Sequence, residues 1–439
     1  MAVDFAKWLV LEEVRALRAR LLRVQSFALY EGMLPAAALL PAAQSAIEVY
    51  LVAGRHRLRM LCDELEQWLL SPSGAAATPS EAQRRLTFLR LKFNAVLTQF
   101  DMFNNVITQR SETETGVWLS GLDVLSSDAL ALKGNYYTAP PLICYLDRGI
   151  GAAIRRARTR LPGGGLSPVA VIRVPRERMV GSSVASSLIH EVGHQAAALL
   201  DLVNSIRPVL QQLQTGDEAT RDAWRLWERW ISEIVADFWS VARVGVTSTL
   251  GLMGVVSLPR VFVFRLNAND PHPMPWIRVK LSCAIGKALF PHPQWDRLAR
   301  VWEAYYPLDD RNEERRGLIA SLLATIPELV SRLAGHRPKA LRGSSLAEAL
   351  DLPLRTPERL NHLFAAWRDE PRQMYEAAPT LVMAVLGQAR ISGYINPEAE
   401  STLIARLLTH WALRATLDTS FACAGADWDE AAAPSRVAN

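Results

Sequence analysis

The sequence predicts a mostly α-helical fold with one small β-sheet (α+β), and three observations support this prediction. Half of the 439 residues are hydrophobic, so the chain can bury a sizeable core. One run, residues 168–174, is rich in β-branched residues and bounded by prolines, which predicts a strand. Long segments show helical periodicity, beginning with Trp8, Leu11, Val14, Leu17, Leu21 and Val24.

The N-terminal third is predicted to be helical, with one break. Residues 71–80 are rich in Ser, Pro, Gly and Ala, which indicates a loop. A helix is expected from Ser80, as its N-cap, to about residue 108. Another helix is expected over 147–161, where a cluster of arginines would lie at a helix C-terminus, a favourable place against the helix dipole. A glycine-rich turn, residues 162–165, then leads into the predicted strand.

Two further helices follow the strand. Residues 181–183 are predicted to form a turn and an N-cap, and the apolar run 184–203 is predicted to form a buried helix. The second helix, 224–241, is rich in tryptophans, which we expect to pack in the core. Beyond residue 279 the chain is expected to be helical again, with helix starts at Ser345, Thr356-Pro357 and Asn396-Pro397.

These patterns suggest four regions. Residues 1–130 form an N-terminal helical region, 131–310 a core that contains the strand, and 311–424 a C-terminal helical region. Residues 425–439 are small and polar and are expected to form a flexible tail.

One pentapeptide carries a chemical signal: His190-Glu191-Val192-Gly193-His194 reads H-E-x-x-H. Histidines four residues apart on a helix share a face, and neutral imidazoles there can hold one zinc ion with Zn–N bonds of about 2.0–2.1 Å. Glu191 points about 100° around the helix, where it can address a water in the open position of zinc. The layout suits metal-assisted hydrolysis, in which a carboxylate takes a proton from the acidified water.

A zinc enzyme usually needs three protein ligands and one open position. The same helix does not supply a third ligand as HExxHxxGxxH, because Ala197 stands at the glycine position and Leu200 at the third histidine. A carboxylate from the helix over 224–241 is the remaining route.

Glu233 and Asp237 lie four residues apart on that second helix, hence on one face. Acidic groups in an apolar run seldom stay buried without a partner. We therefore expect Glu233 to be the third ligand, and Asp237 to accept the free ring N–H of His190 and fix its orientation. The alternative is that both acids face solvent.

These residues resemble a known family. HExxH followed by ExxxD is the signature of the gluzincin metallopeptidases, and the Ala-Asp ending of residues 233–237 is common in their prenyl-protein-processing and heat-shock membrane proteases. Residues 270–279 look like the His-Pro-x-x-x-x-Arg-Ile segment of that group. The resemblance covers roughly residues 190–279 and the preceding strand, and it implies a zincin-like metallopeptidase core flanked by helical regions.

The resemblance also implies roles for two later residues. His272 would donate a hydrogen bond to the oxyanion, and Arg278 would orient the acidic ligand network. In gluzincins an edge strand just before the zinc helix pairs with the substrate. The prolines around 169–174 are tolerated best at an edge, but the sequence leaves the position of this strand open. His272 could also be an ordinary loop histidine.

Composition narrows the other possibilities. The net charge is +5, but no nucleic-acid motif accompanies the densest arginine cluster, so we expect no nucleic-acid partner. Four scattered cysteines suggest neither a disulfide framework nor a second zinc site. The N-terminus lacks the pattern of a signal peptide, and residues 244–264 are interrupted by Pro259 and Arg260. We therefore expect a cytoplasmic protein without a membrane span, in contrast to the membrane-bound group it resembles.

The predicted function is that of a zinc metalloendopeptidase acting on a peptide or protein substrate. His190, His194 and Glu233 would bind one Zn²⁺, Glu191 would be the general base, and the oligomeric state stays open. The alternatives are a zinc-stabilised helical interaction or scaffold protein without turnover, or a scaffold in which HExxH occurs by chance.

Overall fold

The structure is a computed structural model that describes residues 2–24, 28, 32–148, 151–175, 181–267, 270–308, 313–350 and 352–432. It is 75% helical with one small mixed sheet, which confirms the predicted fold class.

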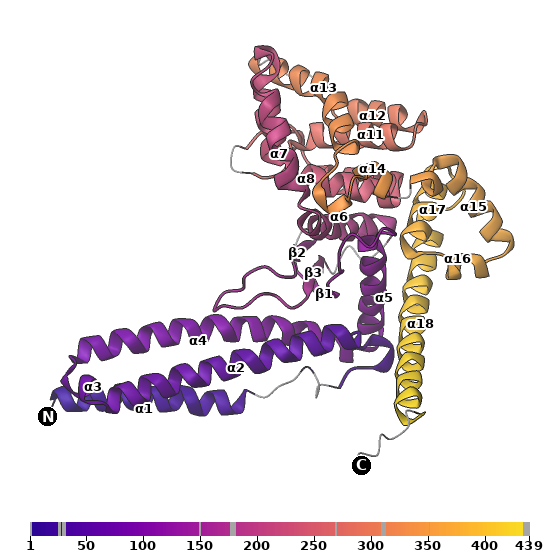
Figure 1. The fold of residues 1–439 in the computed structure, drawn as a ribbon. Helices are drawn as coiled ribbons and strands as arrows, with labels where there is room; N and C mark the ends of the chain where they lie inside the picture. Colours follow the sequence, from indigo (N-terminus) through magenta and orange to yellow (C-terminus); the bar gives the residue numbers. More distant parts are fainter. Residues whose placement is uncertain are drawn as a thin grey trace.

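The N-terminal helices form a long arm (Figure 1). Helices α1 (Ala2–Arg23), α2 (Pro41–Leu70) and α4 (Pro79–Thr108) pack along one another. The loop predicted over 71–80 instead contains the short helix α3 (Pro72–Ala76). The N-cap of α4 is Thr78 rather than Ser80, because Pro79 takes the first helical position, where its missing N–H costs nothing. Two 3-10 turns complete this part, η1 (Pro35–Ala37) and η2 (Gln109–Ser111).

The sheet has the order β1-β3-β2, with strands β1 (Leu142–Asp147), β2 (Ala153–Arg155) and β3 (Ala170–Pro175). The predicted strand is confirmed as β3, which pairs in parallel with β1 and antiparallel with β2. It is therefore the central strand of the sheet and not an edge. Its flanking prolines fit this place because they stand at the ends of the ladder, with Pro175 as the last residue of the strand.

The helix predicted over 147–161 is wrong. The end of β1, strand β2 and part of a β-ribbon occupy these residues, because pairing with β3 overrides the local helical pattern. The arginine cluster therefore lies on an extended ribbon and not at a helix C-terminus.

Helices α6 (Ser182–Leu199) and α8 (Arg221–Val244) confirm the two helices predicted after the strand. They pack against each other, and α5 (Thr113–Leu130), α9 (Val246–Val256) and α11 (Pro275–Leu289) surround them. The remaining elements are α7 (Leu202–Leu213), η4 (Glu218–Thr220), α10 (Arg260–Val263), α12 (Gln294–Tyr305), α13 (Glu313–Ala334), η5 (Lys339–Leu341), α14 (Leu346–Ala349), η6 (Leu352–Arg355), α15 (Pro357–Asp369), α16 (Arg372–Glu376), α17 (Pro379–Ile391) and α18 (Pro397–Ala432).

Three predicted helix starts are confirmed by side-chain caps. Ser345 accepts from Glu348 N in a capping box, Thr356 accepts from Arg359 N, and Asn396 accepts from Ala399 N. Helix α18 continues to Ala432, so it includes the first part of the predicted tail. Residues 433–439 of that tail lie outside the described residues.

The described hydrophobic core forms two clusters. One fills the arm and reaches the sheet through Ile143, Val169 and Val171. The other runs from α5 to α18 and contains the buried Trp227, whose neighbours on α8 pack with it as the sequence predicted. The site helices and the C-terminal helices share this second cluster, while the predicted region boundaries stay predictions.

In the described part of the chain, one helix has the length and apolar composition to cross a membrane. This helix is α13, and 39% of its apolar window is buried inside the protein. Thr325 of α13 accepts a hydrogen bond from the Trp227 indole at 2.8 Å, so one face of the helix belongs to the core. The expectation of no membrane span stays a prediction.

Candidate metal centre

Helix α6 carries both histidines of the pentapeptide on one face. The ring centroids of His190 and His194 are 4.9 Å apart, with an angle of 86° between the ring planes. The two rings lie close together because residues four positions apart in a helix are separated by about one turn. The face they share turns toward α8.

Gly193 sets how closely α6 approaches α8. A Cβ at this position would lie 2.9 Å from Ala236 Cα and 3.0 Å from Ala236 O. Only glycine permits such a contact between the two backbones. A glycine inside a helix lowers helix stability by about 0.8–1.0 kcal/mol relative to alanine. At this position the glycine lets the histidines of α6 approach the carboxylate of α8.

Glu233 of α8 lies between the two histidines. Its Oε2 is 3.2 Å from His190 Nε2, and its Oε1 is 3.3 Å from His194 Nε2. The three ligand atoms lie within 4.8 Å of one another, a group that could hold a metal ion. Tetrahedral ligands at about 2.0–2.1 Å from zinc are about 3.3 Å apart. The two N···O separations are of that size, but each histidine approaches a different oxygen of Glu233.

Asp237 stands one turn beyond Glu233 and contacts the other side of His190. Its Oδ1 lies 2.8 Å from His190 Nδ1, although the ring N–H is not well aligned for a hydrogen bond. A carboxylate at this nitrogen leaves Nε2 free to face the ligand group.

Arg278 of α11 connects the two acids of α8. Its Nε and Nη2 donate to the two oxygens of Asp237 at 2.7 and 2.9 Å, and Nη2 also donates to Glu233 Oε2 at 3.4 Å. The guanidinium fork thus fixes one carboxylate at two points and touches the other.

His272 approaches the same carboxylate from the loop before α11. Its Nε2 lies 3.3 Å from Glu233 Oε2, and its side chain is 50% exposed. Asp270, a residue the sequence reasoning missed, accepts from the backbone N–H of His272 at 3.0 Å and lies 2.7 Å from His272 Nδ1. The turn-forming pattern Asp-Pro-His could have indicated it, because aspartate often caps the backbone two residues on.

The pKa shifts in the cluster reflect the pairing of two buried carboxylates with histidine and arginine side chains. Burial alone would raise the pKa of Glu233, but contacts from His190 and His194 hold it well below its usual value. Burial also opposes the ionised form of Asp237, yet Arg278 and His190 lower its pKa to about 2. Burial would lower the pKa of His190, but Asp237 and Glu233 raise it to about 9. Both carboxylates are therefore ionised at neutral pH.

Glu191 points into a cavity of about 160 Å³ beside these residues. His190, His272 and Arg278 line the same cavity. The rest of its wall is formed by Asp237 of α8, by two serines of α6, by the two residues that precede β2, and by Ser248, Leu252 and Val255 of α9. The Glu191 carboxylate therefore borders a cavity next to the ligand group. A carboxylate in this position can act on a water molecule or a substrate that enters the cavity.

The structure brings all the sequence-predicted site residues together. His190, His194 and Glu233 form the ligand group, Asp237 and Arg278 brace it, and Glu191 and His272 face the cavity. The alternative that both acids of α8 face solvent is wrong, since Glu233 and Asp237 are buried. Comparison with known protein families, characterised proteins and solved structures found no match to this chain.

Proposed function

We propose that this protein is a zinc-dependent metalloendopeptidase of the gluzincin type. The observation that carries the proposal is the position of Glu191 on a cavity beside the compact group formed by His190, His194 and Glu233. A purely structural zinc site usually closes its fourth position with a protein ligand, and it has no need of an acid beside that position.

The three ligand residues would hold one zinc ion. Zinc bound there would acidify water and polarise the carbonyl group of the scissile bond. The ligand set keeps its geometry because Asp237 and Arg278 fix the positions of His190 and Glu233.

Glu191 acts as the general base and then as the acid. Its carboxylate accepts a proton from the attacking water and returns that proton to the leaving amine. The cavity beside it gives room for both the water and the scissile bond.

His272 stabilises negative charge on the substrate carbonyl oxygen as the bond is attacked. Asp270 occupies Nδ1 of the ring, so Nε2 can donate only when the ring carries both protons. A positioned donor at a site of developing charge is among the larger catalytic contributions.

The test compares wild type with Glu191→Gln, which is nearly isosteric but cannot take up a proton at neutral pH. Zinc is measured by elemental analysis, and both proteins are assayed on a peptide library. Equal zinc content with cleavage by the wild type alone is expected. Glu328→Gln, at an exposed ion pair on α13, is the matched control and should cleave normally. Wild type that binds no zinc, or a Gln variant that cleaves as well as wild type, would refute the proposal.

A further inference from the structure

The outer strand of the sheet begins at the cavity of the candidate centre. Among the described strands, β2 pairs with β3 alone and lies at one edge of the sheet. Gly151 and Ala152, which directly precede β2, line the cavity together with His190 and Glu191. An extended chain that enters the cavity can therefore continue along β2 by main-chain pairing.

Between β2 and β3, residues 156–169 form an antiparallel β-ribbon, which we call the ribbon. Arg158 N donates to Ser167 O at 2.8 Å, Ser167 N donates to Thr159 O at 2.8 Å, and Leu161 N donates to Gly165 O at 3.0 Å. Ala157 N donates to the Gln195 side chain of α6 at 2.9 Å. The ribbon is thus fixed to the helix that carries the two histidines, and in Figure 1 it runs from the sheet toward α4.

The ribbon and the two strands that it connects carry positive charges only. Residues 151–175 contain Arg155, Arg156, Arg158, Arg160 and Arg173 but no acidic residue. The first four are exposed, and no carboxylate of the described residues lies within 4.0 Å of their guanidinium groups. In the described part of the chain, the guanidinium groups of Arg155 and Arg158 donate hydrogen bonds to neutral groups, the Gln99 side chain and the Thr138 carbonyl. Exposed arginines without acidic neighbours are available to an anionic partner.

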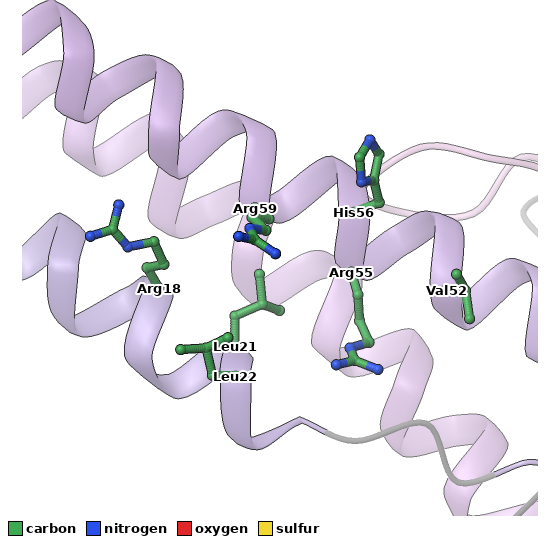
Figure 2. A pocket seen from close by; sticks show the side chains of 7 residues that line it. All are labelled: Arg18, Leu21, Leu22, Val52, Arg55, His56 and Arg59. Carbon is green, nitrogen blue, oxygen red and sulfur yellow. The ribbon is translucent and has the colours of Figure 1, made fainter.

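A second basic surface, on the arm, differs in this respect. Figure 2 shows a hollow between α1 and α2 that is lined by three arginines and a histidine. There Arg18 already pairs with Asp63 and Glu66, and Arg18 and Arg55 point in different directions. The charge of Arg18 in this hollow is therefore already compensated, unlike that of the four exposed arginines of β2 and the ribbon.

We propose that the ribbon selects substrates that carry Asp or Glu residues on the N-terminal side of the cleaved bond. This inference rests on the proposed peptidase function. A substrate strand antiparallel to β2, the commoner pairing, would have its N-terminal part next to Arg155 and its C-terminal part at the cavity. At about 3.3 Å per residue, the first arginine lies about 10 Å beyond Ala152, so the acids would stand about three to six residues before the bond.

An acidic peptide fits this surface better than a single-stranded nucleic acid. Residues 151–175 contain no Phe, Tyr or Trp, and single-strand binders combine positive charge with aromatic side chains on which bases stack. Main-chain pairing along β2 is likewise open to a peptide and not to a sugar–phosphate backbone.

The test uses three fluorescent peptides of identical composition around the cleaved bond. One has Glu residues on the N-terminal side, one has them on the C-terminal side, and one has Gln in their place. The proteins are wild type, Arg156→Ser/Arg160→Ser and the matched control Arg84→Ser/Lys92→Ser, which removes two exposed cations from α4. Cleavage is measured as kcat/KM, and binding is measured by anisotropy with the zinc-loaded Glu191→Gln protein.

Wild type should prefer the N-terminal Glu peptide to the Gln peptide, and the ribbon variant should lose about three- to tenfold of that preference. The control should keep the preference, and high salt should reduce it. Cleavage of all three peptides at equal rates, a preference for C-terminal Glu, or tight binding of single-stranded RNA in place of the Glu peptides would overturn the inference. Charge-dependent binding without any cleavage would instead refute the peptidase function and leave the ribbon as an acidic-peptide site.

Discussion

Arg278 and Asp237 meet through two parallel contacts, Nε to Oδ2 at 2.7 Å and Nη2 to Oδ1 at 2.9 Å. The same carboxylate faces His190 Nδ1. A residue of α11 thereby controls the orientation of a ring on α6 through an acid on α8. Three helices are linked at one carboxylate, which makes this contact the first to test.

Arg278→Lys should weaken zinc binding without unfolding the protein. A lysine donates from a single point and cannot hold both oxygens of Asp237, so the zinc dissociation constant should rise about 10–100-fold. Competition with a chromophoric chelator measures this constant. Arg332→Lys, at an exposed pair with Glu328, should leave it unchanged. Unaltered zinc affinity in Arg278→Lys would show that the contact does not support the ligand group.

Asp270→Asn should reduce turnover but not metal content. Asparagine keeps the size of the side chain but removes the charge that faces His272 Nδ1 at 2.7 Å. We expect kcat to fall by no more than the about 10²–10³-fold that loss of an oxyanion donor costs, with little change in KM. Steady-state kinetics and elemental analysis check both points. Asp296→Asn, which breaks an exposed contact to Lys287, serves as the control, and zinc loss in Asp270→Asn would contradict the assigned role.

Metal removal should destabilise the folded protein. Zinc present at about 100 times its dissociation constant stabilises the native state by about 2.7 kcal/mol. Urea unfolding after chelation, with and without added zinc, measures this difference. His194→Ala should abolish the zinc-dependent shift, whereas His56→Ala on the exposed face of the arm should retain it. A full shift in His194→Ala would place the ion elsewhere.

Of the four cysteines, only Cys423 should react with a thiol reagent in the native protein. It is exposed, and the other three are buried. Burial raises the pKa of Cys62 to about 11 and that of Cys283 to about 12, from a usual value of 9.0. Mass spectrometry after brief alkylation at neutral pH should find one modified site, and after unfolding four. Rapid native alkylation of Cys283 would contradict its burial.

The same pKa shifts have a defined effect on stability. Because the folded-state values lie above the unfolded ones, the neutral thiols of Cys62 and Cys283 contribute stability fully below about pH 9. That contribution is lost as the pH rises toward 11 and 12. Urea midpoints measured across this range should fall less in Cys62→Ala and Cys283→Ala variants than in wild type.

Gly193→Ala should destabilise the protein although alanine is the better helix former. The gain in helix propensity is about 1 kcal/mol, but the new Cβ would lie 2.9 Å from Ala236 Cα, and overpacking typically costs about 1–3 kcal/mol. We expect a net loss of up to about 2 kcal/mol, together with weaker zinc binding. Gly254→Ala is the matched control, because a Cβ there meets nothing within 4 Å and should stabilise α9. A stabilised Gly193→Ala protein would contradict the close approach.

The ligand group could be predicted from the sequence because helical spacing determines it. Two histidines four apart share a face in any helix, and two acids such as Glu233 and Asp237 in an apolar run need a buried partner. The strand before α6 could also be predicted, since four of the six residues 169–174 are β-branched.

Other features depend on contacts between distant segments. Strand β2 is only three residues long, Ala153 to Arg155, and its sequence fits a helix until β3 pairs with it. The role of Gly193 depends on a backbone that lies 43 positions further along the chain, at Ala236. The sequence pattern of a single segment cannot predict such contacts between distant segments.

The contact at Gly193 also bears on which ion the centre can accept. The separation of the α6 and α8 backbones is determined here by main chain against main chain. A cation with longer bonds, such as Ca²⁺ at about 2.3–2.6 Å and with six to eight oxygen ligands, would need the ligand side chains to reorient or the two helices to move apart. We therefore expect the size of residue 193, which has no side chain here, to influence which ion the proposed centre prefers.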